Sequence, residues 1–259
     1  MSQPVLWLGV SLKMYFGYQQ TLDWCHDVAA LARRHPAIQR GDIGLFVLPA
    51  YPAIPAAAAI FADTPVRVGS QDVCQAENGA WTGEVSASML QELGCSLAEI
   101  GHAERRRHFN EDSAQIAAKV AMSLSHGLTP VLCIGEAQQG EPSQAIALCQ
   151  QQLGEALSLA HQQGLTGTLF FAWEPQWAIG APQPAPESYI RAVCKGVRHL
   201  PTPAGITLQV IYGGSAGPGL IQRLGGTVDG LFLGRFAHDP AALEQIIDEA
   251  SALAEECHS

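Results

Sequence analysis

Basic residues are scarce in this 259-residue sequence, in which 14 Lys and Arg stand against 24 Asp and Glu for a formal net charge of −10. A chain of this charge repels the phosphates of nucleic acids, so we expect no nucleic-acid partner. An anionic ligand would need a local positive field, made by a few Lys or Arg side chains and by backbone N–H groups. Hydrophobic residues make up 47% of the chain, which excludes intrinsic disorder.

Cysteine pairs with the spacing of a zinc knuckle or a small disulfide framework are also absent. The seven cysteines lie at positions 25, 74, 95, 133, 149, 194 and 257. None forms a Cys-x-x-Cys pair, so we expect reduced thiols in a cytoplasmic protein. The first residues lack the basic and apolar regions of a secretion signal, which agrees with that location.

A single segment, residues 43–62, is free of charge over a length that could cross a membrane. Prolines at 49, 52 and 55 interrupt it, and Asp42 and Asp63 border it. These features favour a buried strand, a turn and a short Ala-rich helix, and we expect no membrane partner.

Short apolar runs bounded by turn residues recur along the whole chain. They are VLWLGV from Val5, IGLFVL from Ile43, VRVG from Val66, SLAEIG from Ser96, TPVLCI from Thr129, TLFFAW from Thr168, ITLQVIY from Ile206 and DGLFLG from Asp229. Stretches of helical length separate them, for example residues 112–125, 143–161 and 186–199. Strands that are apolar on both faces and alternate with helices indicate a parallel sheet covered by helices.

Eight such units predict a single (β/α)8 barrel domain over residues 1–259. A doubly wound open sheet is the alternative. The glycine-rich loop Gly-x-Gly-x-x-Gly, which is typical of many open sheets, does not follow the first run.

Active sites of such barrels lie at the C-terminal ends of the strands, so reactive side chains are expected just past each run. The residues found there are Ser11, Lys13, Gln71, His102, Glu104, Glu136, Glu174, Ser215, Gly234 and Arg235. The loops after the last two strands, around Ser215 and Gly234, are where this fold commonly binds phosphate.

Each of these residues could also be a structural hydrogen-bonding group. Glu104 and Glu174 could be the two carboxylates of a barrel glycosidase, although aromatic residues are too few for a cleft that stacks sugars. His102 and His108 lack the i, i+4 spacing of a helical zinc site, so no metal is expected.

Seven motifs in order along the chain resemble those of triosephosphate isomerases. They are Lys13-Met14, NGAWTGEVS at residues 78–86, GHAERRRHF at 101–109 with Glu111, CIGE at 133–136, EPQWAIG at 174–180, YGGS at 212–215 and residues 229–234. They cover every sector of the expected barrel except the second.

This resemblance implies an isomerase that interconverts aldose and ketose forms, or two ketoses, of a small sugar phosphate through an enediolate, without a cofactor. Glu174 would be the base, His102 would polarise the carbonyl and Lys13 would stabilise the developing negative charge. Gly180, Ser215, Gly234 and Arg235 would hold the phosphate, and residues 175–185 would form a lid. Glu136 and Tyr212 resemble the groups that latch this lid, and Glu104 is expected to orient Lys13.

The sequence departs from the family pattern around this site. Ser11 stands where the family has Asn, Ala103 where it has Ser, and Phe232 where it has Leu. Pro182 replaces a hinge glycine of the lid, and Arg235 replaces a glycine of the phosphate loop. Smaller residues at 11 and 103 and an added Arg favour a four-carbon ketose phosphate as substrate, with triose phosphates as the alternative.

The loop over residues 71–86 resembles the segment through which family members form homodimers, so we expect a homodimer. Asp72 and Trp81 differ from the usual residues, but Thr82 and the rest of the loop are present. A regulatory protein that binds a sugar phosphate without catalysis is a further alternative. Retention of Lys13, His102 and Glu174 together argues against it.

Overall fold

Eight parallel strands close into one barrel in the order β1 to β8, with β1 paired to β8. The structure is a computed structural model that describes the backbone of residues 5–258 and the side chains of residues 5–256. The strands are β1 (Leu6–Ser11), β2 (Ile43–Leu48), β3 (Arg67–Ser70), β4 (Leu97–Ile100), β5 (Thr129–Ile134), β6 (Gly167–Trp173), β7 (Ile206–Tyr212) and β8 (Gly230–Leu233). The predicted barrel is confirmed, and the open sheet is excluded.

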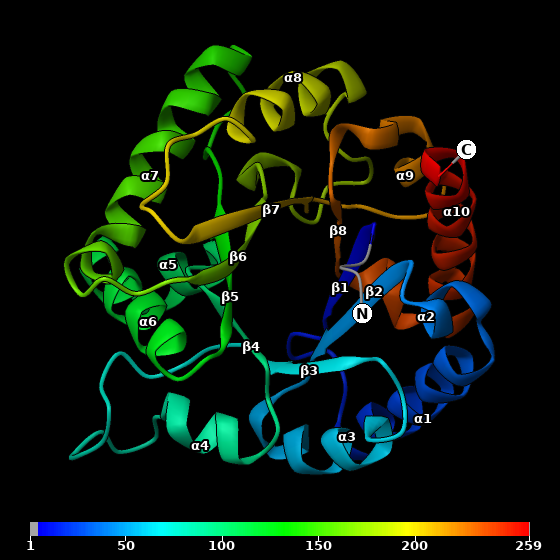
Figure 1. Ribbon diagram of the computed structural model, residues 1–259, viewed down its shortest axis with the longest axis horizontal. Coiled ribbons are helices and arrows are strands. Elements are labelled where there is room, and N and C mark those ends of the chain that lie inside the picture. The colour runs from blue at the N-terminus through cyan, green and yellow to red at the C-terminus, as the bar shows by residue number, and fades with distance from the viewer. Residues whose placement is uncertain (1–4, 259) are drawn as a thin grey trace.

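Helices form a ring outside the strands (Figure 1). They are α1 (Tyr18–Arg34), α2 (Pro36–Arg40), α3 (Ile54–Phe61), α4 (Ala87–Glu92), α5 (Ala103–Phe109), α6 (Ser113–Ser125), α7 (Pro142–Gln162), α8 (Glu187–Val197), α9 (Leu220–Leu224) and α10 (Pro240–His258). Short 3-10 turns lie at η1 (Tyr51–Ala53), η2 (Gln176–Ala178), η3 (Gly225–Thr227) and η4 (Arg235–His238).

The uncharged segment at residues 43–62 folds as predicted, into β2, η1 and α3. All six residues of β2 are buried, because one face of the strand packs in the lumen and the other against helices. Within the described part of the chain, every helix falls short of the length or the apolar character that crossing a bilayer requires. The six cysteines with described side chains are free and buried, whereas the side chain of Cys257 lies outside the described residues.

Aromatic rings fill the barrel lumen. The rings of Phe46 and Phe170 lie 5.0 Å apart between centroids, and Phe232 stacks 6.2 Å from Phe46. Gly9 makes this packing possible, since a Cβ atom at this position would overlap the Phe46 ring. The lumen is therefore a packed core that supports the site at one end.

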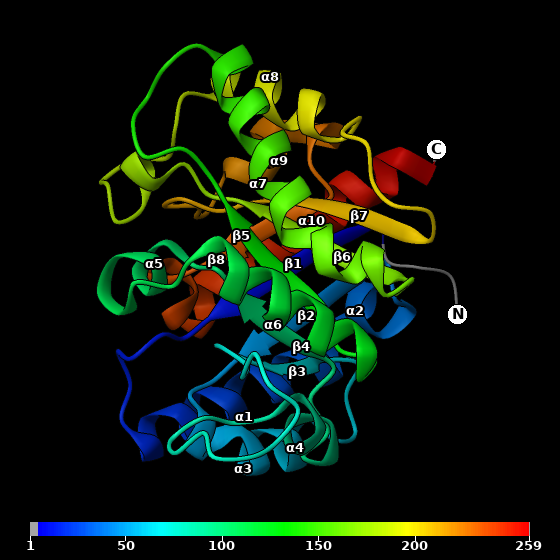
Figure 2. The same cartoon turned by 90° about the vertical axis from the view of Figure 1, so that its left-hand side faces the viewer.

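The two ends of the barrel carry different segments. Figure 2 shows α5, which follows β4, at one end of the barrel and α2, which precedes β2, at the other. The loops after β6, β7 and β8 lie at the same end as α5. The C-terminal strand ends thus bring together residues from distant parts of the sequence.

Candidate active site

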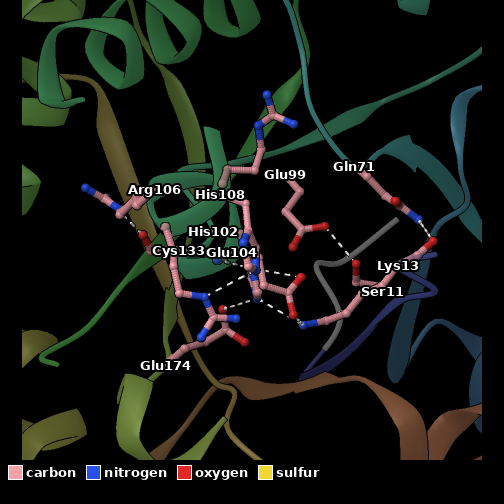
Figure 3. Close-up of polar contacts among 12 residues, drawn as sticks. Ser11, Lys13, Gln71, Glu99, His102, Glu104, Arg106, His108, Cys133 and Glu174 are labelled. Atoms are coloured by element: carbon pink, nitrogen blue, oxygen red, sulfur yellow. Dashed lines mark hydrogen bonds and ion pairs between the residues drawn. The ribbon is translucent and has the colours of Figure 1, made fainter. Parts of the chain in front are cut away.

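Lys13, His102 and Glu174 converge at the C-terminal end of the barrel, although they follow β1, β4 and β6. The Nε2 atom of His102 lies 3.3 Å from the Lys13 Nζ atom and 3.4 Å from Glu174 Oε2. Figure 3 shows the imidazole between the other two side chains. His102 and Glu174 are buried, at 3% and 8% exposure, so a ligand that contacts them is shielded from water. The three predicted residues therefore form one cluster.

The start of α5 fixes the orientation of the His102 ring. His102 caps this helix, and its Nδ1 atom accepts a hydrogen bond of 3.1 Å from the backbone N–H of Glu104. A neutral ring that accepts at Nδ1 carries its proton on Nε2. This N–H and the Lys13 ammonium are both donors, and they meet where a ligand oxygen could accept from both.

Lys13 is held by its backbone and by carboxylates. Its φ of 51° lies in the left-handed region, which a non-glycine residue adopts only where surrounding contacts enforce it. The ammonium pairs with Glu104 Oε1 at 2.8 Å, as the resemblance implied. Burial lowers the Lys13 pKa, but Glu174, Glu104 and Glu99 together outweigh it and leave the pKa raised. The side chain therefore stays charged at neutral pH.

Glu174 fits the site because two glycines make room for it. A Cβ atom at Gly213 would lie 2.6 Å from Glu174 Oε1, and one at Gly135 would overlap the Glu174 carbonyl. The buried Oε2 atom of Glu174 makes no hydrogen bond of regular geometry within the described structure, and His102 Nε2 lies 3.4 Å from it. Phe232 and Ile179 line the same cavity and add apolar surface beside this carboxylate. A buried carboxylate oxygen without a strong hydrogen bond is suited to accept a proton.

A cavity of about 280 Å³ contains most of the predicted site. Its lining includes Ser11, Lys13, Glu174, Gly180, Ser215, Gly234 and Arg235. His102 lines a neighbouring, wider cavity of about 690 Å³, which shares Ser11, Lys13 and Glu104 with the first. Lys13, Arg107 and Arg235 give the smaller cavity a local positive character within an acidic protein. Among the side chains that the structure describes, no three His, Cys, Asp or Glu gather as metal ligands would.

The lid at residues 175–185 contacts the loops after β7 and β8. The single Ser215 hydroxyl proton is shared between two lid carbonyls, with Oγ 2.7 Å from that of Ala181 and 3.0 Å from that of Ala178. Arg235 donates to Ala181 at 2.6 Å and to Gly180 at 3.3 Å. The Arg235 guanidinium therefore lies on the lid backbone, among the residues that line the cavity.

The two residues that resemble lid latches both contact the lid or the strand before it. Glu136 accepts hydrogen bonds from Trp173, Trp177 and Tyr189 at 3.0 to 3.1 Å. The Tyr212 hydroxyl accepts from the backbone N–H of Ala185 at 3.0 Å. These contacts hold the lid over the cavity in this conformation.

Glu99 is a site residue that the sequence analysis missed. It lies in β4 two positions after Leu97, which packs in the lumen, and strand alternation places Glu99 on the same inner face. Ser11 Oγ donates to its carboxylate at 2.8 Å (Figure 3). Burial and, to a lesser extent, the Glu174 carboxylate raise the Glu99 pKa, whereas His102, Lys13 and the hydrogen bond from Ser11 lower it. The result is a pKa of about 7. The signal was a single Glu at an inward position of an apolar run.

Glu99→Gln is predicted to change how stability depends on pH. The folded chain keeps a proton on Glu99 that the unfolded chain loses, because burial raises the pKa from 4.5 to about 7. The stability that this proton contributes is lost as pH rises through 7, and an amide has no such loss. We expect the unfolding free energy of the variant to rise relative to wild type by up to about 3 kcal/mol between pH 5 and pH 9. Urea unfolding at both values measures this, and parallel pH profiles would contradict it.

Comparisons with known proteins agree with the family resemblance of the residues in this site. Residues 6–250 match the triosephosphate isomerase family. The chain is 57% identical over 255 residues to a protein of Pectobacterium atrosepticum named L-erythrulose-1-phosphate isomerase, with 98% of each chain covered. Proteins with the same name from Rhizobium etli and Brucella abortus are 35% and 36% identical, over 96% and 89% of this chain and 93% and 91% of theirs. On its fold, its site and these matches, the chain belongs to the triosephosphate isomerase family and is an isomerase.

Proposed function

We propose that this isomerase acts on a four-carbon ketose phosphate, L-erythrulose 1-phosphate, without a metal or an organic cofactor. The observation that carries the reaction is the convergence of the Lys13 ammonium, the His102 Nε2 atom and the buried Glu174 carboxylate at one end of the barrel. The choice of substrate rests on the names of the relatives and on the small residues at 11 and 103.

The chemistry of this substrate decides where the proton moves. The carbonyl is at C2, and the C1 oxygen carries the phosphate, so the carbonyl cannot move to C1 while the phosphate ester is kept. The proton must therefore leave C3, and the product is the ketose phosphate with its carbonyl at C3. A hydroxymethyl group, C4, is attached to the reacting carbon.

Three side chains carry out the transfer in this proposal. Glu174 takes the C3 proton, the C–H electron pair forms the C2–C3 double bond, and the carbonyl electrons move onto the C2 oxygen. Lys13 and the His102 N–H stabilise this oxygen, and His102 moves the hydroxyl proton between the two oxygens. Glu174 then returns its proton to C2, so the product is an isomer and the enzyme is unchanged.

The phosphate lies in the part of the cavity lined by Gly180, Ser215, Gly234 and Arg235 in this proposal. The lid conformation supports this placement, since Ser215 and Arg235 hold the lid carbonyls over the same cavity. A closed lid keeps water from the enediolate and discourages loss of phosphate.

Steady-state kinetics with pure substrates tests the choice of substrate. We expect kcat/KM for L-erythrulose 1-phosphate to exceed that for its D enantiomer and for dihydroxyacetone phosphate by at least about a hundredfold. Preference for dihydroxyacetone phosphate would make the protein a triosephosphate isomerase with altered residues around its site. Tight binding without turnover of any of these compounds would favour the regulatory alternative, which neither the relatives' names nor the cluster of Lys13, His102 and Glu174 supports.

We also propose that two copies of the chain form a homodimer through the loop at residues 71–86. Residues 77–84 are all exposed, and the loop projects beside α4, away from the barrel (Figure 1). The wider cavity is lined by Met14, Tyr15 and Phe109, which are 94%, 65% and 66% exposed. An apolar, open cavity next to an exposed loop suits mutual insertion of two copies.

The cytoplasmic location stays a prediction, to which the free buried thiols are suited.

Trp81→Glu is predicted to separate this dimer. Trp81 is 45% exposed at the loop tip, so a charge there costs little in one chain but would be buried against a partner. Sedimentation equilibrium at micromolar concentration should give the mass of two wild-type chains and of one variant chain. A wild-type mass of one chain would refute the dimer.

A further inference from the structure

The paired side chains of Ser11 and Glu99 have no part in the proton transfer described above. Glu99 is 3% exposed and Ser11 2%, in a lumen that is otherwise apolar in this region. Burying a carboxyl group among apolar side chains is unfavourable unless it is well hydrogen-bonded. Yet within the described structure, Ser11 is the one hydrogen-bond donor to this carboxylate. A buried carboxyl group with so few hydrogen bonds next to the reacting atoms indicates a role in binding the substrate.

The position of the pair relative to the two cavities indicates what it contacts. Ser11 and Lys13 line both the cavity of about 280 Å³ and the wider one, and Glu99 lines the wider one. Ser215 and Arg235, on the proposed phosphate side, line the smaller cavity, whereas Glu99 lines the wider one, and Ser11 and Lys13 belong to both. A ligand whose phosphate lies at Arg235 and whose reacting carbon lies at Glu174 therefore extends its far end toward Ser11 and Glu99.

We propose that Ser11 and Glu99 form a subsite for the terminal hydroxymethyl group of the four-carbon substrate. A substrate hydroxyl group can donate to the Glu99 carboxylate while Ser11 keeps its own hydrogen bond to that carboxylate, so Glu99 gains a second donor. The short Ser11 side chain leaves room for this group where the family has a longer Asn. The subsite selects four-carbon over three-carbon ketose phosphates, and it rests on the substrate class proposed above.

Selection of this kind can be strong. A pocket that only offers space discriminates by about 10- to 200-fold per methylene, whereas one built to hydrogen-bond a substrate hydroxyl rejects the analogue without it by about 10⁴-fold. The reason is that a three-carbon substrate leaves the buried carboxyl without its second partner. The Glu99 pKa, raised to about 7 by burial, agrees with a carboxyl that lacks hydrogen-bond donors before substrate binds.

The test compares two substrates in five proteins: wild type, Glu99→Leu, Glu99→Gln, Ser11→Ala and a control variant. We expect Glu99→Leu to lower kcat/KM for L-erythrulose 1-phosphate by at least about 100-fold and to change kcat/KM for dihydroxyacetone phosphate by less than about threefold. Glu99→Gln and Ser11→Ala should lower the ratio of the two kcat/KM values, L-erythrulose 1-phosphate over dihydroxyacetone phosphate, by about 10-fold. Ser70→Ala, which also removes a buried hydroxyl from a strand end, is the control and should leave the ratio unchanged.

The outcomes separate this inference from the proposed function. An equal fall in kcat/KM for both substrates in folded variants would overturn the subsite and make the pair a support for Lys13. Wild-type preference for dihydroxyacetone phosphate would overturn the substrate class itself, before any variant is compared. Thermal unfolding shows which variants are folded, and if Glu99→Leu does not fold, the near-isosteric Glu99→Gln and Ser11→Ala carry the same comparison.

Discussion

Replacing Glu174 with Gln is expected to lower kcat by at least about a thousandfold. The amide has nearly the same size as the carboxylate but cannot accept a proton from carbon at neutral pH. The Oε2 atom that does so in our account makes no hydrogen bond of regular geometry within the described residues and lies 3.4 Å from His102 Nε2. The loss should appear in kcat, because the phosphate and hydroxyl contacts of the substrate remain.

Two further measurements show whether the loss of kcat is specific to the carboxylate of Glu174. The Kd of L-erythrulose 1-phosphate for the variant, measured by calorimetry, should stay within a few fold of the wild-type KM. Glu92→Gln, the same change at the exposed end of α4, should leave kcat unchanged. Retention of more than a tenth of wild-type turnover by Glu174→Gln would show that another group is the base.

Replacing Lys13 with Met is expected to lower kcat/KM by about 100- to 1,000-fold. The change keeps the length of the side chain and removes a charge that counts most when the carbonyl oxygen becomes negative. The variant also loses the 2.8 Å ion pair with Glu104, so its thermal midpoint must be measured together with its activity. Lys195→Met on the exposed face of α8 is the matched control. A loss of less than tenfold in a folded variant would contradict the role of Lys13.

Local patterns in the sequence predicted the barrel because each strand and helix follows from short-range rules. An apolar run such as Ile43–Leu48 must be buried on both faces, and the prolines after it end the strand and start α3. The rule that barrel sites form at the C-terminal strand ends then placed Lys13, His102 and Glu174 together without any knowledge of distances.

Such short-range rules could not predict contacts between side chains across the barrel. Ser11 and Glu99 are 88 residues apart on strands that are not neighbours, and their hydrogen bond depends on the register of the whole barrel. The position of Arg235 on the lid carbonyls likewise depends on where the lid lies, which sequence motifs do not specify. Apolar runs therefore place Glu99 in a strand, and its inward position in that strand is the one local signal of its role.

The pairing of Lys13 with Glu104 was predicted from the family resemblance, and the structure confirms it at 2.8 Å. The orientation of His102 follows from a local feature, since the residue caps α5 and accepts from the N–H of Glu104. Sequence motifs thus located the reactive groups, and the structure adds which atom of each faces the ligand.

The central claim is that Glu174 exchanges a proton at C3 of a four-carbon ketose phosphate. Proton NMR of L-erythrulose 1-phosphate in D₂O with the wild-type enzyme tests it directly. Our account predicts that deuterium from the solvent appears at C3 of the remaining substrate or at C2 of the product, and that Glu174→Gln abolishes this exchange. Rapid exchange into dihydroxyacetone phosphate, with none into the four-carbon compound, would contradict it.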